Sequence, residues 1–520
     1  MNVKHLIGRA ARQFPERTAL VDKDKRLTFE ELNRRANCLA NGLLDLGVTK
    51  ADHVGILLSN CYQFIECDFA LSKTGIVRVP LNASLSARDH KYTLNDSKCK
   101  ALIFGEKFTE DVEMMRNELE TVEKFVCVSN EIPMSLDAIG YEDIIGNSSP
   151  EEPATRIERQ DLHTLFYTSG TTGKPKGAML TQEAWASVAM NLLLDYGPIT
   201  QEDVLLNVQP LSHGAGFFVL PFFIRGAAQV LVEFKTSLVF QTIEREKVTV
   251  FKLVPVMLKR LLEDPDKTRY DLTSLKHIIY GGSPIGRPLL EDSLRFFGRI
   301  LSQLYGQGEI PMAITVLSRE DHILEGTEEE ARRLNSAGKA CTNVEVKIVD
   351  EKGAEVRPGV VGEIVARGYH CMSGYWGLTG ATAETLKDGW IHTGDLGYMD
   401  SKGFVFLVDR KKEVIISGAF NIYPAEVEQV LVTHPSIAEV AVIGVPDDNW
   451  GESVKAIVVL KKNHQSPEKD IIDFCKENGL KFKTPKSVEF VDELPRSHYG
   501  KVDKKILREP YWAGLKRNIH

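Results

Sequence analysis

Tyr167-Thr-Ser-Gly-Thr-Thr-Gly-Lys-Pro-Lys-Gly177 is the segment from which the fold class of this chain can be worked out. Its eleven residues hold four serine and threonine hydroxyls, three glycines and two lysines, and they follow the strand-like run Thr164-Leu-Phe-Tyr167. Glycines let backbone N–H groups turn toward a ligand, hydroxyls add donors and lysines add positive charge, which together can replace the hydration shell of a triphosphate. We therefore expect a loop that binds polyphosphate.

This loop does not match a Walker A sequence. That motif ends in Gly-Lys-Ser/Thr and opens a helix, whereas Pro175 and Lys176 stand where glycine and lysine are required. A flexible surface linker has a similar composition, but apolar residues flank this loop closely, with Phe166 before it and Ala178 after it. The pattern predicts a phosphate loop outside the ordinary P-loop fold.

Length and composition limit the classes of protein that this chain can represent. With 520 residues, 43% of them hydrophobic, the chain is expected to form two or more domains, and its net charge of −8 gives no reason to expect a nucleic-acid partner. The eight cysteines lack zinc-like spacing, the N-terminus lacks the apolar core of a signal peptide, and no run of about 18 apolar residues indicates a membrane helix. We expect a soluble cytoplasmic protein, and a homodimer is compatible with these features.

Short apolar runs alternate with helix-length segments up to about residue 400. Thr28-Phe-Glu-Glu31 is a capping box that opens a helix, and residues 53–58 and 101–104 have the pattern of strands. This alternation is typical of an α/β domain with several sheets. Beyond residues 409–412 the pattern becomes a compact mixture of helices and strands. We therefore predict a large α/β N-terminal domain over residues 1–410 and a small, mobile α+β C-terminal domain over residues 411–520.

Five further segments follow the phosphate loop in a fixed order. They are Gln-Pro-Leu-Ser-His at 209–213, Leu-Tyr-Gly-Gln-Gly-Glu at 304–309, His-Thr-Gly-Asp-Leu-Gly at 392–397, Asp-Arg-Lys-Lys-Glu at 409–413 and Pro-Arg-Ser-His-Tyr-Gly-Lys at 495–501. Together with the loop they resemble the adenylate-forming superfamily, and within it the acyl-CoA synthetases that act on fatty or aryl acids. The resemblance extends from the first helix to Lys501.

The resemblance implies a two-step ligase. A carboxylate attacks the α-phosphate of ATP to give an acyl-adenylate and pyrophosphate, and the thiol of coenzyme A then displaces AMP. Because one anion attacks another, this chemistry needs neutralised phosphate charge and a positioned metal ion more than it needs an acid or base. ATP, Mg²⁺ and coenzyme A are therefore the expected cofactors and co-substrates.

The resemblance also assigns catalytic roles to individual residues. Lys501 would contact the α-phosphate and the acyl carboxylate, where a positive charge stabilises the forming bond. Glu309 would bind Mg²⁺ together with Thr168, and Lys176 would contact the phosphates. Taken singly, Glu309 could equally sit in a surface ion pair and Lys501 could be a solvated charge. Their order in one chain favours the functional interpretation.

Other residues are implied to hold the nucleotide. Tyr305 would lie against the adenine, Asp395 would accept hydrogen bonds from the ribose hydroxyls, and Arg410 would donate to the same sugar. Asp395 alone could simply cap a turn. The remaining nucleotide contacts are implied for Ser169, Gly170, Thr171, Thr172, Gly173, Gly281, Gly282, Ser283, Gly306 and Gln307.

Movement of the small domain is a further implication of the resemblance. Lys501 lies about ninety residues beyond the predicted boundary, so the small domain would have to close over the large one for the first step. Lys412 matches the hinge position, and Gly418 and Ala419 match the segment that faces the site for thiol transfer. One departure concerns the nucleotide site: Gly308 stands where the family usually has a threonine that donates to the AMP phosphate.

The expected acyl pocket carries almost no charge. Its predicted residues are His213, Gly214, Phe217, Gly282, Gly306 and Pro311. An apolar acid fits such a pocket, whereas an amino acid is disfavoured because residues 212–217 offer no aspartate for its ammonium group. His213 could gate the pocket or be an ordinary core histidine.

Two alternatives to an acyl-CoA synthetase remain open at this point. An enzyme that loads a carrier protein would share the first step, and since the sequence continues for only 19 residues after Lys501, such a carrier would act in trans. Coenzyme A is the simplest acceptor. A regulator that binds nucleotide without turnover belongs to a different class, and the presence of Lys501, Glu309 and Asp395 argues against it.

Overall fold

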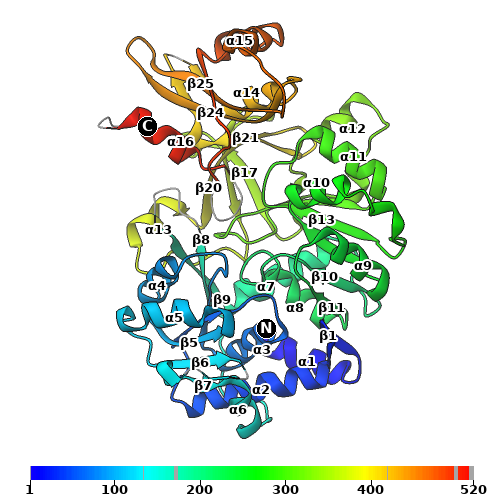
Figure 1. The fold of residues 1–520 in the computed structure, drawn as a ribbon, viewed down its shortest axis with the longest axis vertical. Coiled ribbons are helices and arrows are strands. Elements are labelled where there is room, and N and C mark those ends of the chain that lie inside the picture. The colour runs from blue at the N-terminus through cyan, green and yellow to red at the C-terminus, as the bar shows by residue number, and fades with distance from the viewer. Residues whose placement is uncertain are drawn as a thin grey trace. The chain divides into compact units, whose positions relative to one another are not determined.

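The chain forms two compact units (Figure 1). The structure is a computed structural model that describes residues 2–129, 131–132, 134–168, 174–418, 420–496 and 502–513. The first unit comprises Met1–Val346 and Ala366–His392, and the second comprises Lys347–Val365 and Thr393–His520. The predicted fold class, a large α/β unit with several sheets followed by a smaller C-terminal unit, is confirmed. Because the units share the chain in alternating segments, the single boundary at residue 410 stays a prediction.

A seven-stranded sheet in the first unit carries the predicted phosphate loop. Its order is β7-β6-β5-β3-β4-β8-β9, and all neighbours are parallel except β8 and β9. The strands are β3 His53–Leu57, β4 Val77–Pro80, β5 Cys99–Gly105, β6 Lys124–Val128, β7 Ile139–Gly140, β8 Leu162–Thr168 and β9 Lys176–Thr181. The loop therefore joins two antiparallel strands whose last paired residues are Thr168 and Lys176.

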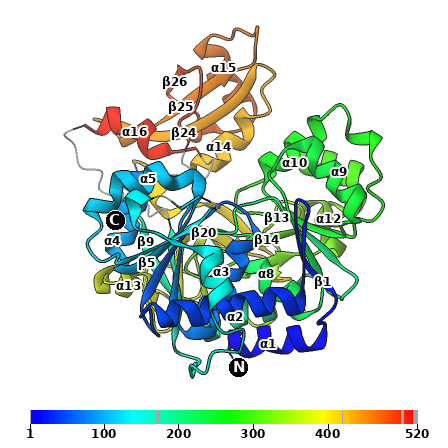
Figure 2. The same cartoon turned by 60° about the horizontal axis from the view of Figure 1, so that its bottom comes forward.

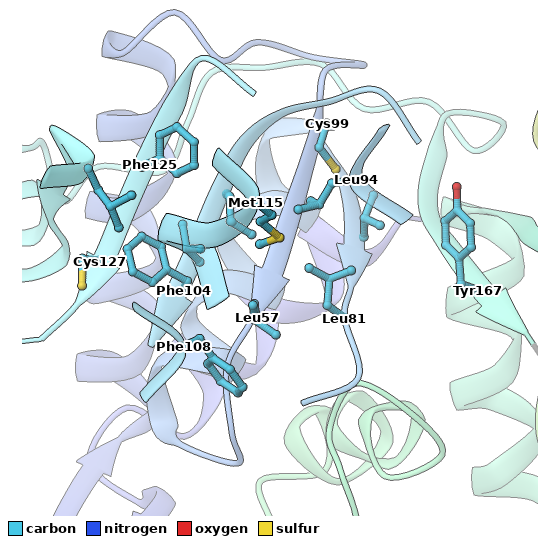
Figure 3. Close-up of a cluster of buried hydrophobic side chains, with 14 of the residues drawn as sticks. Leu57, Leu81, Leu94, Cys99, Phe104, Phe108, Met115, Phe125, Cys127 and Tyr167 are labelled. Atoms are coloured by element: carbon cyan, nitrogen blue, oxygen red, sulfur yellow. The ribbon is translucent and has the colours of Figure 1, made fainter. Parts of the chain in front are cut away.

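The core of this sheet fixes the strand that leads into the loop (Figure 3). Leu57, Leu81 and Phe104 belong to this buried cluster, and Tyr167 of β8 lies at its edge. The Tyr167 hydroxyl donates a hydrogen bond to Asp96 Oδ2 at 2.6 Å. Opposite it on β9 stands a glycine, Gly177, where a Cβ would lie 3.1 Å from the Tyr167 ring. The end of β8 is thus anchored by burial and by one hydrogen bond.

A nine-stranded sheet forms the other half of the first unit. Its order is β16-β15-β14-β13-β12-β10-β11-β1-β2, with a parallel centre from β14 to β1. The strands are β1 Thr18–Asp22, β2 Lys25–Thr28, β10 Val204–Asn207, β11 Ala228–Leu231, β12 Val250–Leu253, β13 His277–Gly281, β14 Leu301–Tyr305, β15 Thr315–Leu317 and β16 Lys339–Ala340. Parallel neighbours bring the carboxyl ends of β10, β12, β13 and β14 to one edge of the sheet.

Helices cover these two sheets, and α1 and α2 lie side by side (Figure 2). The predicted capping box at Thr28 and Glu31 is confirmed, since both of its hydrogen bonds are present at the start of α2. No helix in the described part of the chain combines the length and apolar composition needed to cross a bilayer. The helices of this unit are α1 Val3–Gln13, α2 Phe29–Asp45, α3 Tyr62–Thr74, α4 Ala87–Asp96, α5 Thr109–Met115, α6 Tyr141–Asn147, α7 Gln182–Asp195, α8 Gly216–Ile224, α9 Thr236–Glu246, α10 Pro255–Glu263, α11 Arg287–Phe297, α12 Glu328–Arg333 and α13 Thr379–Thr385.

The C-terminal half of the chain holds two further sheets. One contains β17 Glu345–Val349, β18 Gly362–Arg367, β19 Leu386–Lys387, β20 Trp390–Met399 and β21 Val405–Arg410. The other contains β22 Ile415–Ser417, β23 Phe420–Ile422, β24 Ile437–Asp447, β25 Gly451–Leu460 and β26 Ser487–Phe490. Side chains alternate along β24, so that Val442 packs with α14 Pro424–Leu431 and α15 Glu468–Glu477, and Ala441 packs with α16 Lys504–Trp512.

Candidate functional site

The predicted nucleotide residues of the first unit gather at one edge of the nine-stranded sheet. Gly281 ends β13 and is paired with Leu304 of β14, which places it beside Tyr305 at the end of the next strand. A Cβ at Gly281 would lie 2.5 Å from the Leu304 carbonyl oxygen, so only glycine fits this position. Gly282 follows with a φ of 82°, a left-handed conformation that glycine adopts without strain. Ligands of α/β proteins bind at such carboxyl edges of parallel strands.

Glu309 contacts Thr168, which precedes the phosphate loop, and Tyr375, whose ring lies near Lys176. Its Oε1 accepts hydrogen bonds from Thr168 Oγ1 at 3.3 Å and from the Tyr375 hydroxyl at 2.7 Å. The Lys176 ammonium lies 5.0 Å from the centre of the Tyr375 ring. The place where strand β8 ends and strand β9 begins therefore holds one carboxylate, two hydroxyls and one ammonium group. This is an arrangement suited to phosphate oxygens and a hard cation.

Tyr375 is a residue that the sequence analysis missed. Three backbone hydrogen bonds, each 2.9 Å long, join its segment to strand β9: Met179 N donates to Gly374 O, Ser373 N to Met179 O, and Trp376 N to Gly177 O. Burial, and secondly the charge of Glu309, raises the pKa of the Tyr375 phenol well above its usual range. The phenol therefore keeps its proton and donates a hydrogen bond to the carboxylate. No periodicity in the sequence around Tyr375 marks this role.

Several predicted site residues lie outside the described residues. They are Ser169, Gly170, Thr171, Thr172, Gly173, Ala419 and Lys501. Their assigned roles stay predictions that rest on the sequence. What the structure describes is the pair of residues that border the phosphate loop, Thr168 and Lys176, and their neighbours.

Close contacts account for two glycines between Tyr305 and Glu309. A Cβ at Gly306 would lie 2.7 Å from the backbone of Met312. Residue 306 must therefore be glycine for the two segments of backbone to approach each other this closely. A Cβ at Gly308 would lie 2.1 Å from Thr168 Cγ2. The methyl group of Thr168 therefore occupies the space where a residue other than glycine at 308 would begin its side chain. Between these glycines, Gln307 donates its backbone N–H to Ile310 O at 3.2 Å.

The predicted acyl-pocket segment lies against a buried group of aromatic rings. Phe217 is buried at the start of α8, with ring centres 5.3 Å from Phe166 and 4.5 Å from Trp185. His213 is partly buried, and its ring centre lies 5.9 Å from that of Phe166. Burial, and secondly the positive charge of Lys252, lowers the pKa of His213 to about 4, so its imidazole is neutral at pH 7. Its gating role stays a prediction.

Lys252 on β12 is a second residue that the sequence analysis missed. It is 8% exposed, and its Nζ donates a hydrogen bond to Gln209 Oε1 at 2.6 Å. Its ammonium also lies close to Gly214, since a Cβ on that residue would be only 2.5 Å from Nζ. The signal in the sequence was a lysine in the middle of the apolar run Val250-Phe-Lys-Leu-Val254. A charged residue at the centre of a buried strand is rare enough to be informative.

In the second unit, Asp395 and Arg410 face each other on neighbouring strands. They are paired in the register of β20 and β21, and Arg410 Nε lies 2.8 Å from Asp395 Oδ1. The Asp395 side chain is buried and that of Arg410 is half-exposed. Both side chains were predicted to bind one ribose, and they do lie together.

The predicted hinge and thiol-side residues follow directly along the chain. Lys412 is exposed in the 3-10 turn Lys411–Glu413. Gly418 has a φ of 64°, directly after the end of β22. Its N–H donates to the Trp450 carbonyl at 2.7 Å, and a Cβ would lie 2.8 Å from the Trp450 ring. Glycine is therefore required at this position on two separate grounds.

Comparison with known proteins assigns the chain to a family. A family model described as AMP-binding enzyme matches residues 7–376, and one described as AMP-binding enzyme C-terminal domain matches residues 426–501. The chain belongs to the AMP-binding enzyme family. The predicted resemblance to adenylate-forming enzymes is thereby confirmed.

Individual relatives of this AMP-binding enzyme cover nearly the whole chain. A medium/long-chain-fatty-acid–CoA ligase of Mycobacterium tuberculosis is 35% identical over 99% of this chain and 91% of its own length. A fatty acid–[acyl-carrier-protein] ligase of Streptomyces coeruleorubidus is 33% identical over 98% and 96%, respectively. The structure of o-succinylbenzoate CoA synthetase from Bacillus subtilis with its acyl-adenylate intermediate is 33% identical, covers 96% of this chain and 97% of that chain, and superposes with a TM-score of 0.84. The predicted enzyme class, an AMP-forming acid–thiol ligase of the acyl-CoA synthetase branch, is confirmed.

Proposed function

We propose that this AMP-binding enzyme activates a carboxylic acid with ATP, releases pyrophosphate, and transfers the acyl group from the acyl-adenylate to coenzyme A with release of AMP. The observation that carries the proposal is the convergence of Thr168, Lys176 and Glu309 at the two ends of the phosphate loop. These half-exposed groups suit a polyphosphate with its cation, because an ammonium group and hydroxyls complement phosphate oxygens and a carboxylate complements a hard cation.

In the first step, the residues of the first unit act by holding charge. Lys176 supplies an ammonium group to the phosphates, and Tyr375 keeps Glu309 oriented through its 2.7 Å hydrogen bond. The acyl carboxylate then needs only alignment with the α-phosphorus, since pre-oriented reactants avoid most of the entropic cost of meeting. Lys501 is the residue we assign to stabilising the charge that forms between them.

We also propose that Glu309 binds Mg²⁺. The described residues contain no group of three or more His, Cys, Asp or Glu side chains that could hold a metal ion by themselves. Mg²⁺ bound to a nucleotide commonly uses one or two carboxylates, with phosphate oxygens and water completing its shell. Glu309 with Thr168 Oγ1 beside it fits that need. When bound, Mg²⁺ would neutralise phosphate charge.

The acid that we propose has an apolar body. Phe217, Pro311 and the rings around Phe166 line the predicted pocket with hydrocarbon. Coenzyme A is the acceptor that we favour, as in the fatty-acid and o-succinylbenzoate CoA ligases, and a carrier protein acting in trans is the alternative that the Streptomyces relative supports. The cytoplasmic location and the homodimer remain predictions.

Acid-dependent exchange of pyrophosphate into ATP tests the first step, and release of AMP on adding coenzyme A tests the second. We expect Lys501→Ala to lower exchange on the order of a hundredfold or more, while thioester formation from supplied acyl-adenylate is largely kept. Equal loss of both partial reactions would contradict the assignment of Lys501 to the first step. Exchange without coenzyme A-driven release of AMP would indicate a carrier-protein acceptor. Nucleotide binding without any exchange would indicate a regulator.

A further inference from the structure

We propose that Lys252 recognises a second carboxylate on the substrate, so that the preferred substrate is a dicarboxylic acid whose two acid groups are separated by an apolar body. This inference rests on the proposed function, because it names the class of acid that the same site would activate. It follows from three features of Lys252: its burial, its lack of a carboxylate partner, and its place beside the predicted acyl pocket.

The surroundings of Lys252 leave most of its hydrogen-bonding capacity unused. Its side chain reaches Gln209 Oε1 at 2.6 Å, and this is its only hydrogen bond within the described ranges. An ammonium group has three donors. Other groups near its ammonium are apolar or neutral: the Phe218 ring centre lies 5.8 Å from Nζ, Gly214 carries no side chain, and His213 is uncharged at pH 7.

Other buried cations of the first unit show how this protein normally places a positive charge. Arg78 pairs with Asp68 and lies over the Trp185 ring, with its guanidinium carbon 4.4 Å from the ring centre. Lys73 is fully buried and contacts Glu152 Oε2 at 3.4 Å, besides two asparagine side chains. Each of these cations has a carboxylate. Lys252 has none among the residues that the structure describes.

A buried ammonium group without a counter-charge is costly unless something completes its environment. If Lys252 served only to fill the core, an uncharged residue such as methionine would fill the same space more favourably. The missing partner is therefore best supplied from outside the chain. A carboxylate matches both the charge and the unused donors of the ammonium group, whereas a neutral oxygen would match the donors alone.

The position of Lys252 directs that partner into the acyl pocket. Lys252 stands near the carboxyl end of β12, next to β13, at the sheet edge that also holds Gly281 and Tyr305. Its ammonium lies against Gly214, and a Cβ there would also approach Met312 Cε to 3.6 Å. Gly214 was predicted to line the acyl pocket, and so was Pro311, which directly precedes Met312. Because residue 214 is glycine, it places no side chain against the ammonium.

The test compares matched pairs of acids in ATP–pyrophosphate exchange. Suitable pairs are octanoate with octanedioate, decanoate with decanedioate, and 3-phenylpropanoate with its 4-carboxy derivative. We expect the wild-type chain to have a higher kcat/KM for the diacid of at least one pair. Lys252→Met should lower the value for that diacid on the order of 30-fold or more, the effect of leaving one buried charge of a pair unpaired, and should leave the monoacid unchanged or improved.

Lys259→Met is the matched control, since Lys259 lies on the exposed face of α10 of the same unit. It should leave both acids unaffected. Wild-type exchange with monoacids alone, or a Lys252→Met chain that loses both acids of a pair equally, would overturn this inference and leave the proposed function standing. If Lys252→Met does not fold, the wild-type preference between the acids of each pair decides the question. Absence of exchange with every acid would instead refute the proposed function.

Discussion

Replacing Lys252 by methionine should make the first unit more stable at neutral pH. Burial lowers the pKa of Lys252 from 10.5 to about 8. Since one unit of pKa corresponds to about 1.4 kcal/mol, the buried charge destabilises the fold by about 3 kcal/mol at pH 7. Methionine has a similar shape without the charge. It also leaves Gln209 Oε1 without its hydrogen bond, which costs about 1 kcal/mol. The expected net gain is about 2 kcal/mol.

The sign of the pH dependence separates this explanation from a simple packing effect. Between about pH 8 and 10.5 the unfolded chain keeps the proton that folded Lys252 has lost, so the free energy of unfolding of the wild type rises with pH through this interval. The penalty is fully present below about pH 8 and decreases progressively until about pH 10.5. The difference in free energy of unfolding between Lys252→Met and wild type should therefore decrease as pH rises. At pH 9.5 the penalty from the buried charge should be less than half of its value of roughly 3 kcal/mol at pH 7.

Urea unfolding followed by tryptophan fluorescence measures the effect, because Trp185 lies in the same unit as Lys252. Wild type, Lys252→Met and the exposed control Lys259→Met would be compared at pH 7 and pH 9.5. Lys259 should show almost no difference, because its ion pair with Glu263 is exposed on both sides. A Lys252→Met chain that is less stable than wild type at both pH values, or whose difference from wild type does not change with pH, would refute the reasoning.

Two further predictions concern the surroundings of Glu309. Tyr375→Phe removes the 2.7 Å hydrogen bond to the Glu309 carboxylate, a loss of about 1.5 kcal/mol or more. ATP–pyrophosphate exchange should therefore fall roughly tenfold and require a higher concentration of Mg²⁺. An unchanged dependence on Mg²⁺ concentration would show that Tyr375 does not position Glu309. Gly308→Ala forces a Cβ to within 2.1 Å of Thr168 Cγ2 and should lower the melting temperature, as overpacking costs about 1–3 kcal/mol. Adding Thr168→Ser removes that methyl group and should restore stability, whereas equal stability of Gly308→Ala and wild type would contradict the described contact.

Local signals in the sequence predicted local features of the structure well. The capping box of Thr28 and Glu31 needs only four consecutive residues, and both of its hydrogen bonds are present. The phosphate loop was placed after a strand because apolar residues precede it, and β8 does end at Thr168. The family resemblance assigned Asp395 and Arg410 to one ribose. The two residues are paired across adjacent strands, and their contact with a ribose stays a prediction.

Residues defined by distant contacts could not be predicted in this way. Tyr375 gains its role from Glu309, which lies 66 residues earlier in the sequence. Lys252 depends on Gln209, 43 residues earlier, and on the absence of a carboxylate, which only three-dimensional neighbours can reveal. Apolar periodicity reports which face of an element is buried. It does not report which polar group from another element meets that face.

The backbone hydrogen bonds between residues 374–376 and β9 determine when the site can assemble during synthesis of the chain. Strands β8 and β9 are adjacent in the sequence, so their hairpin can pair soon after residue 181 leaves the ribosome. Glu309 emerges much later, and its Tyr375 partner later still. During that interval the phosphate-binding half of the site exists without its oriented carboxylate. The hydrogen bond that orients Glu309 therefore cannot form in a growing chain until almost three-quarters of its 520 residues have been made.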